Sequence, residues 1–582
     1  MSSTPDVIVM GGGLAGLTLA RQLTRRRPGT RVTLLERSTR PLPRACHKVG
    51  ESSVEVGTHY FAEVLGLRPY LEREHLPKNG LRFFCGRGDI EDRTEIGPGE
   101  LPPVPSFQLD RGKLESDLRA MVAPHVDLRE GWSVRDIELS SDGAHRVRAT
   151  APDGQLHALG ARWVVDATGR RRLLRPRLGL ARGSAIDASA AWFRIAGRVD
   201  PASLASPSAV RWRSRDPRDH RWLSTNHLTG RGYWVWLIPL ATGHTSVGIV
   251  ADRAEHPDGS FHREASARAW LADHEPALAA RLDGVPFEDF GFVRDYSYGA
   301  EAFLGESRWA CVGEAAFFVD PLYSPGSDFI AFTNTFATEL IADDLEGRFD
   351  PARLRAFEAL LLPMARDLER TLGGQGSVFE HPEVLSAKLW WDYYVYWAFM
   401  AAYFFHRIYR LDAAGQAPFL ELRTAYEALN QRMQSVFRAW AELRTRPAWK
   451  PRPFVPLPMG LSSLTELHLE LTRPKTPQAC EARMRRDLRE AEVMARELLF
   501  RALHGVGHGN AAELGRRVDL ASWDLPCDPA RIAAEELPRA ARRDRLPRTG
   551  RDLDRALGRA TDEGGVPLRR LLEVAGSPLA AP

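Results

Sequence analysis

Residues 6–36 restrict the fold of this chain more than any other stretch. A short apolar run leads into Gly11, Gly13 and Gly16 in G-x-G-x-x-G spacing, and after a helical stretch a second apolar run ends at Glu36. In such a strand–turn–helix–strand unit the glycines allow a tight turn, close approach of a pyrophosphate and close helix packing, while the acid accepts hydrogen bonds from a ribose diol. The stretch therefore predicts a dinucleotide-binding βαβ unit. The expected ligand contacts are Gly11, Gly13, Leu14, Ala15, Gly16 and Glu36.

Composition narrows the class of protein. The formal net charge is +4 over 582 residues and the arginine clusters are dispersed, so no nucleic-acid partner is expected. The five cysteines show neither C-x-x-C spacing nor pairing with histidines, which predicts a cytoplasmic protein without a metal site. Because the first apolar run begins close to the start of the sequence, no leader segment is expected. The length predicts about two to four domains.

The chain changes character along its length. Alternating segments between residues 189 and 289 predict an antiparallel sheet, and Trp234 and Trp236 in one of them point to the same face of a strand. The predicted fold is α/β, with a Rossmann-like dinucleotide-binding domain, an antiparallel sheet on the substrate side and a helical C-terminal region. The predicted divisions are 1–188 with 290–345, then 189–289, 346–509, and 510–582 as a helical, partly loose extension. The candidate C-terminal helices are Pro351–Leu372, Val384–Tyr409, Phe419–Leu443 and Ala479–Leu503.

The segment Leu389–Phe405 is unusually aromatic. It is short and carries Asp392, whereas a membrane-spanning helix needs about 20 mostly uncharged apolar residues. The segment is therefore interpreted as a buried or tunnel-lining helix rather than a membrane span, with an interfacial membrane patch as the alternative. The aromatic side chains expected to line a substrate site are Trp390, Trp391, Tyr394 and Trp397.

Four separated segments resemble the FAD-binding pattern of flavoprotein monooxygenases of the p-hydroxybenzoate hydroxylase type. They are the glycine motif, Asp110-Arg111, Asp166–Gly169, and Gly313–Ala315 followed by Asp320-Pro321. The resemblance covers roughly residues 5–345 and implies FAD as the cofactor. The further residues that it implies in FAD binding are Lys48, Ser52, Arg111, Gly169, Asp320 and Gly326. Glu314 stands where the family more commonly has an aspartate.

Other motifs are similar to those of one branch, the flavin-dependent halogenases. Trp234–Pro239 matches their W-x-W-x-I-P signature, and Val49–Ser52 looks like their G-E-S/A loop. Lys78, followed by Gly80 and Phe83, looks like the segment that carries their active-site lysine. The loop 320–326 looks like their flavin and halide loop. Each motif also has a plain interpretation, because a loop lysine is usually solvated and a tryptophan pair can simply pack on a core.

The resemblance implies a particular chemistry. Reduced FAD, oxygen and halide would form hypohalous acid, with halide bound at Ser324, Gly326 and Ser327. The acid would cross a tunnel to Lys78 and halogenate an electron-rich aromatic substrate, either free or tethered to a carrier protein. No second G-x-G-x-x-G for a nicotinamide is visible, so a separate flavin reductase is expected as a partner.

The resemblance also implies catalytic roles. Lys78 would hydrogen-bond the oxidant or capture it as a haloamine, and burial would shift its pKa. Glu51 or Glu55 could supply the carboxylate that some members place beside the lysine. Trp234 and Trp236 would separate flavin from substrate, which disfavours direct hydroxylation.

The halide loop departs from the family pattern. Asp328 follows Ser327 where the family usually has apolar residues, and a carboxylate beside an anion site repels halide unless it points away. Two alternatives therefore stay open: a halogenase-like flavoenzyme that hydroxylates or dehydrogenates, and a non-catalytic FAD-binding scaffold. The orientation of Asp328 is the feature that would discriminate between halogenation and the first alternative.

Overall fold

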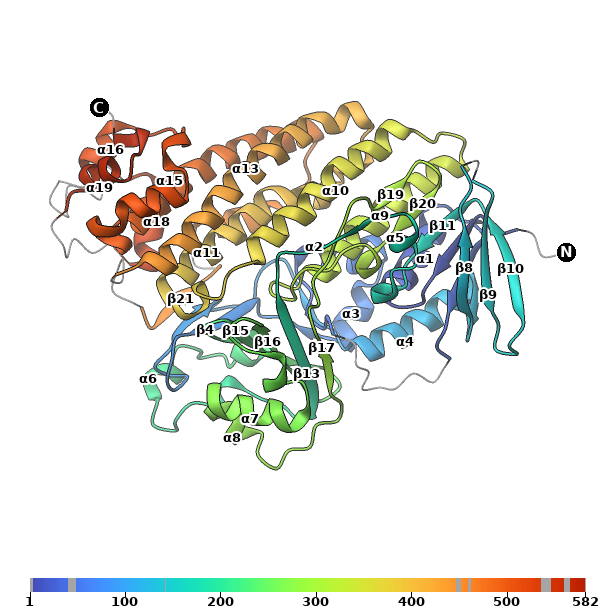
Figure 1. Cartoon of the computed structure of the whole chain (residues 1–582), viewed down its shortest axis with the longest axis horizontal. Helices are drawn as coiled ribbons and strands as arrows, with labels where there is room; N and C mark the ends of the chain where they lie inside the picture. Colours follow the sequence, from blue (N-terminus) through green and yellow to red (C-terminus); the bar gives the residue numbers. More distant parts are fainter. Residues whose placement is uncertain are drawn as a thin grey trace.

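The computed structural model has the predicted α/β fold: a Rossmann-like sheet, a second sheet beside it, and long helices that lie across both (Figure 1). The residues that the structure describes are 4–39, 49–141, 143–445, 452–458, 462–534, 546–558 and 566–580.

A six-stranded sheet carries the glycine motif. Its strands in spatial order are β19 (Leu304–Gly305), β20 (Trp309–Cys311), β11 (Trp163–Asp166), β1 (Val7–Met10), β2 (Val32–Glu36) and β7 (Asp127–Glu130). All neighbours are parallel except β19 and β20. Every residue of β1 is buried, which is why this strand reads as a continuous apolar run rather than an alternating one. The helices beside the sheet are α1 (Leu14–Arg26), α4 (Arg111–Val122), α5 (Leu174–Arg177) and α9 (Pro325–Leu345). A small antiparallel sheet of β8 (Ser133–Glu138), β9 (His145–Thr150) and β10 (Leu156–Ala161) lies next to it (Figure 1).

The second sheet is wider than the segment 189–289 predicted for it. Its eight strands in order are β17 (Gly291–Val293), β13 (Ala188–Ala196), β16 (His244–Asp252), β15 (Tyr233–Pro239), β14 (Thr225–Gly230), β4 (Leu81–Cys85), β5 (Thr94–Gly97) and β21 (Phe454–Pro456). Most neighbours are antiparallel, but β4 with β14 and β5 with β21 are parallel. Parallel pairing is possible there because each pair comes from distant parts of the chain and needs no hairpin. The helices α6 (Val210–Arg213), α7 (Glu264–His274) and α8 (Pro276–Arg281) belong to the same part of the chain. The domain boundaries themselves stay a prediction.

The helical region largely follows the predicted pattern. Its main helices are α10 (Pro351–Leu372), α11 (Pro382–Val395), α12 (Ala402–Phe405), α13 (Ala413–Leu443), α14 (Ser462–Glu470) and α15 (Pro477–Arg517). The shorter helices α16 (Pro529–Ala533), α18 (Arg548–Leu557) and α19 (Leu568–Val574) cluster at the C-terminal end (Figure 1). A π-helical turn, Tyr396–Ala401, joins α11 to α12, so the predicted helix Val384–Tyr409 is divided. None of the helices in the described residues is long and apolar enough to cross a membrane.

Several short elements lie near the two large sheets. The short strands β3 (Leu76–Pro77) and β6 (Phe107–Gln108) pair antiparallel. The helix α2 (Glu55–His59) continues into a π-helical turn and then α3 (Arg68–Glu74), and α2 contacts α9. Strand β12 (Ala181–Arg182) pairs with β18 (Gly299–Ala300). These segments bring residues 49–80 between the two sheets and the helical region.

Candidate active site

A cavity of about 410 Å³, called here the dinucleotide cavity, opens at the carboxyl end of β1. The predicted cofactor residues that line it are Gly11, Gly13, Leu14, Ala15, Glu36, Ser52, Arg111, Gly169, Asp320 and Gly326. Gly16 is not part of the lining but packs behind the turn, and Lys48 lies outside the described residues. Thus β1, β2, α4, β11 and the loop before α9 converge where parallel strands end, which is where α/β sheets bind ligands.

The glycine turn has the geometry that a pyrophosphate needs. Gly11 has φ +107°, and a Cβ there would lie 2.4 Å from the Ala167 carbonyl oxygen. A Cβ at Gly16 would lie 1.9 Å from the Gly11 oxygen. At Gly13, by contrast, the nearest atom to a Cβ is a Glu115 carboxylate oxygen at 4.0 Å. The space in front of Gly13 is therefore open on the cavity side, and the residues present fit FAD.

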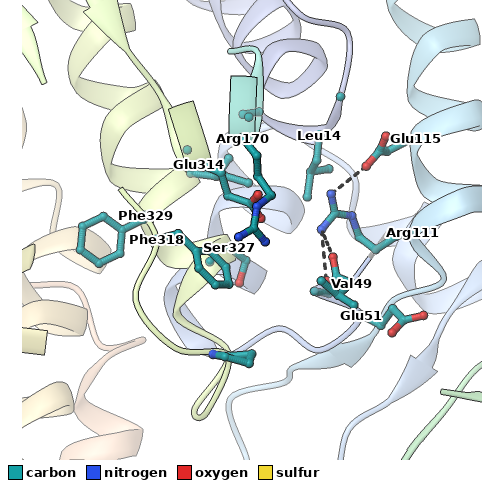
Figure 2. Close-up of a pocket in the computed structure, with 18 of the residues that line it drawn as sticks. Leu14, Val49, Glu51, Arg111, Glu115, Arg170, Glu314, Phe318, Ser327 and Phe329 are labelled. Atoms are coloured by element: carbon teal, nitrogen blue, oxygen red, sulfur yellow. Dashed lines mark hydrogen bonds and ion pairs between the residues drawn. The ribbon is translucent and has the colours of Figure 1, made fainter. Parts of the chain in front are cut away.

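Charged groups line two sides of this cavity (Figure 2). Arg111 on α4 donates to the Val49 carbonyl oxygen at 3.0 Å and to Glu115 at 2.7 Å. Arg170 and Phe318 lie on the opposite side in Figure 2. Glu36 accepts a hydrogen bond from the Gly12 amide at 2.6 Å, so the acid at the end of β2 is held beside the glycine turn.

Asp320 lies at the start of the loop before α9. It accepts hydrogen bonds from the Tyr296 hydroxyl and, at 2.8 Å, from the Leu322 amide. Burial raises the pKa of this carboxyl group to about 6. The group lines the cavity, where it can accept a hydrogen bond from a ligand hydroxyl.

Lys78 lies between β3 and β4 and is buried, with 2% of its surface exposed. Its ammonium nitrogen donates to the Ser52 hydroxyl at 2.7 Å and to the Ser53 carbonyl oxygen at 2.8 Å. Burial lowers the pKa of this amine from 10.5 to about 7, against the opposing charges of Glu55 and Asp328. Lys78 is therefore not the solvated loop lysine that its position in the sequence would usually indicate.

The tryptophan pair faces the dinucleotide cavity. Trp234 and Trp236 both line it, with ring centroids 5.7 Å apart. Trp236 donates to the Ser246 hydroxyl at 3.1 Å, and that hydroxyl donates to Glu51 at 2.6 Å. The Glu51 carboxylate also forms a buried ion pair with Arg194 at 2.6 Å. Glu51 is thus held against the second sheet beneath Trp236, and its bonds are not to Lys78.

The surroundings of Lys78 include Glu55, one of the two carboxylates expected there, and two histidines that the sequence patterns did not indicate. Glu55 at the start of α2 lies 3.2 Å from His468 on α14, two residues 413 positions apart. His227 on β14 lines the dinucleotide cavity and stacks on Phe83 at 4.4 Å. Burial lowers the pKa of His227 to about 3, so its ring is neutral. No local sequence signal indicates that His227 in a strand lies near Lys78, or that His468 in a distant helix contacts Glu55.

The predicted halide loop ends at the N-terminus of α9. Tyr323 and Ser324 have φ values of +65° and +59°, a strained conformation that bends the backbone into the turn. Ser324 makes no side-chain cap, and the first amides of a helix have no partner within it. Among the described residues the buried Ser327 hydroxyl has no hydrogen-bond partner. Gly326 and Ser327 therefore lie where donors at the start of a helix are suited to hold an anion.

Asp328 points away from these amides. One of its oxygens accepts from the Gly57 amide at 2.8 Å and the other from the Tyr396 hydroxyl at 2.6 Å. Burial raises the pKa of the Asp328 carboxyl group to about 7. Its position and its reduced charge both weaken the repulsion of halide that the sequence suggested.

A second cavity, of about 110 Å³, lies between the helical region and the loop before α9. Four carboxylates line it: Glu55, Asp328, Asp367 and Asp392. Its tyrosines are Tyr323, Tyr393 and Tyr396. We call it the acidic cavity. Lys78 lines neither cavity, but it has neighbours in both. Its hydrogen-bond partner Ser52 lines the dinucleotide cavity, and the carboxylates that act on its charge, Glu55 and Asp328, line the acidic cavity.

The aromatic side chains that the sequence predicts as substrate lining lie on the face of the segment 389–405 that points away from the acidic cavity. Trp390, Trp391, Tyr394 and Trp397 line neither cavity and are buried in the core. The same segment presents Asp392, Tyr393 and Tyr396 to the acidic cavity instead. The largest aromatic side chains pack where burial is complete, because there they remove the most apolar area from water.

Comparison with known proteins defines the class. Residues 4–370 match the family model described as FAD binding domain. The chain therefore belongs to the FAD binding domain family. It is an FAD-dependent oxidoreductase of the halogenase and monooxygenase type, and the prediction of FAD as its cofactor is confirmed.

Its relatives define the branch. Flavin-dependent halogenase chlA of Dictyostelium discoideum is 25% identical over 427 residues, which cover 68% of this chain and 70% of that protein. The 1H-pyrrole-2-carbonyl (peptidyl-carrier protein) chlorinase of Pseudomonas fluorescens is 29% identical over 349 residues, 55% of this chain and 72% of that protein. The resemblance to flavin-dependent halogenases is confirmed.

Solved structures agree on the fold. The halogenase PltM has a TM-score of 0.58 at 17% identity and covers 84% of this chain and 96% of its own. The myxobacterial chondrochloren halogenase CndH has a TM-score of 0.52 at 22% identity and covers 82% of this chain and 99% of its own. At these identities the likeness concerns the fold, and the site has to be argued from its own residues.

Proposed function

We propose that this protein is a flavin-dependent halogenase that uses reduced FAD, oxygen and halide to halogenate an electron-rich aromatic substrate. The observation that carries the proposal is the environment of Lys78, which is buried and has a lowered pKa. Its amine donates to Ser52 of the dinucleotide cavity, and its charge is influenced by Glu55 and Asp328 of the acidic cavity. A buried lysine with a lowered pKa in such a position marks a functional site. A scaffold that only binds FAD would need no such group.

The residues of the dinucleotide cavity would bind the cofactor and the halide. The dinucleotide cavity would hold FAD at the glycine turn, Arg111 and Asp320. When bound and reduced, FAD supplies the electrons with which oxygen is activated to oxidise halide to hypohalous acid. Gly326 and Ser327 would hold the halide through the donors at the start of α9. Trp234 and Trp236 would form the wall that keeps the substrate away from the flavin ring.

Lys78 would transfer the oxidant to the substrate. Its neutral amine can capture the electrophilic halogen as a haloamine, releasing water from hypohalous acid. The aromatic carbon then takes the halogen and gives up a proton, which returns to the amine nitrogen. Ser52 holds the amine in place at 2.7 Å, and Glu51 would position Trp236 through Ser246 rather than act on the lysine.

The test is an assay with a separate flavin reductase, chloride or bromide, and a panel of phenols, pyrroles and indoles, free and carrier-bound. The relative from Pseudomonas fluorescens has a carrier-bound pyrrole in its name, so both forms are included. Product mass with a halogen isotope pattern supports the proposal. A product heavier by one oxygen would instead favour a hydroxylase. A control without reductase tests whether reduced flavin must come from a separate partner.

The rate of halogenation should fall as the pH drops through about 7. The pKa of Lys78 is lowered to about 7, so below that pH the amine becomes an ammonium ion, which has no lone pair to capture halogen. Above it the rate should reach a plateau. The measurement is kcat against pH with chloride and again with bromide, since a midpoint that belongs to Lys78 does not move with the halide. A rate that rises in acid would indicate instead that the ammonium form donates a hydrogen bond to the oxidant.

A further inference from the structure

Two carboxylates of the acidic cavity, Asp328 and Asp367, form no ion pair within the described part of the chain. Asp392 is paired with the buried Lys388 at 2.7 Å, and Glu55 lies 3.2 Å from His468. Asp328, however, accepts hydrogen bonds from an amide and a tyrosine hydroxyl. Asp367 accepts one from the Asn430 side chain at 2.9 Å. Neither Asp328 nor Asp367 forms an ion pair with any described residue, and no described lysine or arginine lines the cavity.

Asp367 also has an unused acceptor. Its second oxygen, Oδ1, is buried and has no hydrogen-bond partner among the described residues. Buried charges in proteins are normally paired, because leaving one unpaired costs several kcal/mol. Consistent with this, burial raises the pKa of Asp367 to about 7, as it does for Asp328. The cavity thus offers an unused hydrogen-bond acceptor and carboxyl groups whose ionised form a bound cation would stabilise.

We propose that the acidic cavity binds an aromatic substrate that carries an amino group, with the ammonium group of the substrate paired to Asp367 and attracted by Asp328. This inference rests on the proposed function, since it names the substrate class for the same reaction. An ammonium supplies the missing positive charge, and its three donors can reach both a free carboxylate oxygen and tyrosine hydroxyls. The cavity volume of about 110 Å³ suits a single ring, and Tyr393 and Tyr396 offer aromatic faces to a cation.

Three probes with the same phenol ring test the charge preference: tyramine, tyrosol and 4-hydroxyphenylacetate. Binding to the FAD-loaded protein is measured by calorimetry without halide or reductant, so that no reaction is needed. Tyramine should bind about tenfold to a hundredfold more tightly than tyrosol, the range expected for a charge-assisted hydrogen bond. The carboxylate should bind most weakly, because it is repelled by the acidic residues. Equal binding of tyramine and tyrosol, or tightest binding of the carboxylate, would overturn the inference.

The variant Asp367→Asn places the preference at one residue. The amide keeps the volume and the acceptor for Asn430 but removes the charge, so tyramine binding should weaken to the level of tyrosol while tyrosol binding stays the same. Asp117→Asn on α4, far from the cavity, serves as the matched control and should keep the preference. A preference that survives in Asp367→Asn would contradict the assigned pairing.

Binding and turnover measurements test the amine inference and the proposed reaction independently. If tyramine binds selectively but no probe is halogenated in the presence of reductase and halide, the substrate class stands and the proposed reaction is wrong. If phenols are halogenated with no preference for the amine in either kcat/KM or binding, the reaction stands and the amine inference is wrong.

Discussion

Lys78→Ala should abolish halogenation while the protein still binds FAD. The lysine contacts Ser52 and Ser53 rather than the glycine turn, so its removal leaves the glycine turn, Arg111 and Asp320 in place to hold FAD. A group that handles the reacting halogen contributes about a hundredfold to ten-thousandfold to the rate, and the loss of product should be of that size. Removing a buried amine with a lowered pKa should not unfold the protein, because the amine was costly to bury.

The readouts separate oxidant formation from its use. FAD content is measured by absorbance, substrate halogenation by mass, and hypohalous acid by a small diffusible trap in solution. In Lys78→Ala the trap should still be halogenated, since the proposed site of halide oxidation is the dinucleotide cavity, which the substitution leaves in place. Lys113→Ala, which removes a half-exposed lysine of α4, is the matched control and should retain full activity. Unchanged substrate halogenation in Lys78→Ala would exclude the proposed role of the lysine.

Gly13→Val should yield a folded protein without FAD. The open space in front of Gly13 means that added side-chain atoms meet no protein atom closer than 4.0 Å at the Cβ position. They would instead fill the space that the pyrophosphate needs. We expect FAD binding to weaken about a hundredfold or more, equivalent to about 3 kcal/mol. The measurement is the flavin absorbance of the purified variant, with circular dichroism to confirm the fold.

Gly16→Ala is the informative comparison for this variant. Its Cβ would overlap the Gly11 carbonyl oxygen at 1.9 Å, so the damage is to the protein itself. Such overpacking costs about 1–3 kcal/mol or more, and the variant should melt at a lower temperature even without FAD. A Gly13→Val protein that is yellow and FAD-loaded would show that the pyrophosphate does not pass this glycine.

Local sequence patterns predicted where helices form better than they predicted which side chains of a helix face a cavity. Residues 351–372 were predicted as a helix and form α10 with the same bounds, because proline at the start and apolar spacing along a helix are local signals. The helix predicted for residues 384–409 is interrupted by the π-helical turn Tyr396–Ala401. A π-helical turn changes which residues share a face, and periodicity alone does not reveal it. The residues that reach the acidic cavity, Asp392, Tyr393 and Tyr396, nevertheless share one face at ordinary helical spacing, and the tryptophans lie on the other face.

The site shows the same difference between features encoded by local spacing and features that depend on tertiary contacts. The residues of the glycine turn, Glu36 and the Trp234–Trp236 pair could be placed from the sequence, since each depends on spacing within one turn or one strand. For the carboxylate beside Lys78 the sequence left two candidates, Glu51 and Glu55, and only Glu55 acts on the charge of the lysine. Glu51 was a candidate partner for the lysine but is paired with Arg194 across the second sheet. Asp328 looked like an obstacle to halide but is turned toward Gly57 and Tyr396.

The sequence by itself determined that this chain binds a dinucleotide, that its fold is α/β and that it resembles the flavin-dependent halogenases, because those features are encoded in short motifs whose geometry is local. The tertiary structure decided which groups meet. Lys78 is buried and donates to Ser52, and among the described residues one buried oxygen of Asp367 has no hydrogen-bond partner. His468 contacts Glu55 from 413 positions away. Burial and long-range contact set the pKa of each group and the charge of each cavity, and no spacing along the chain records them.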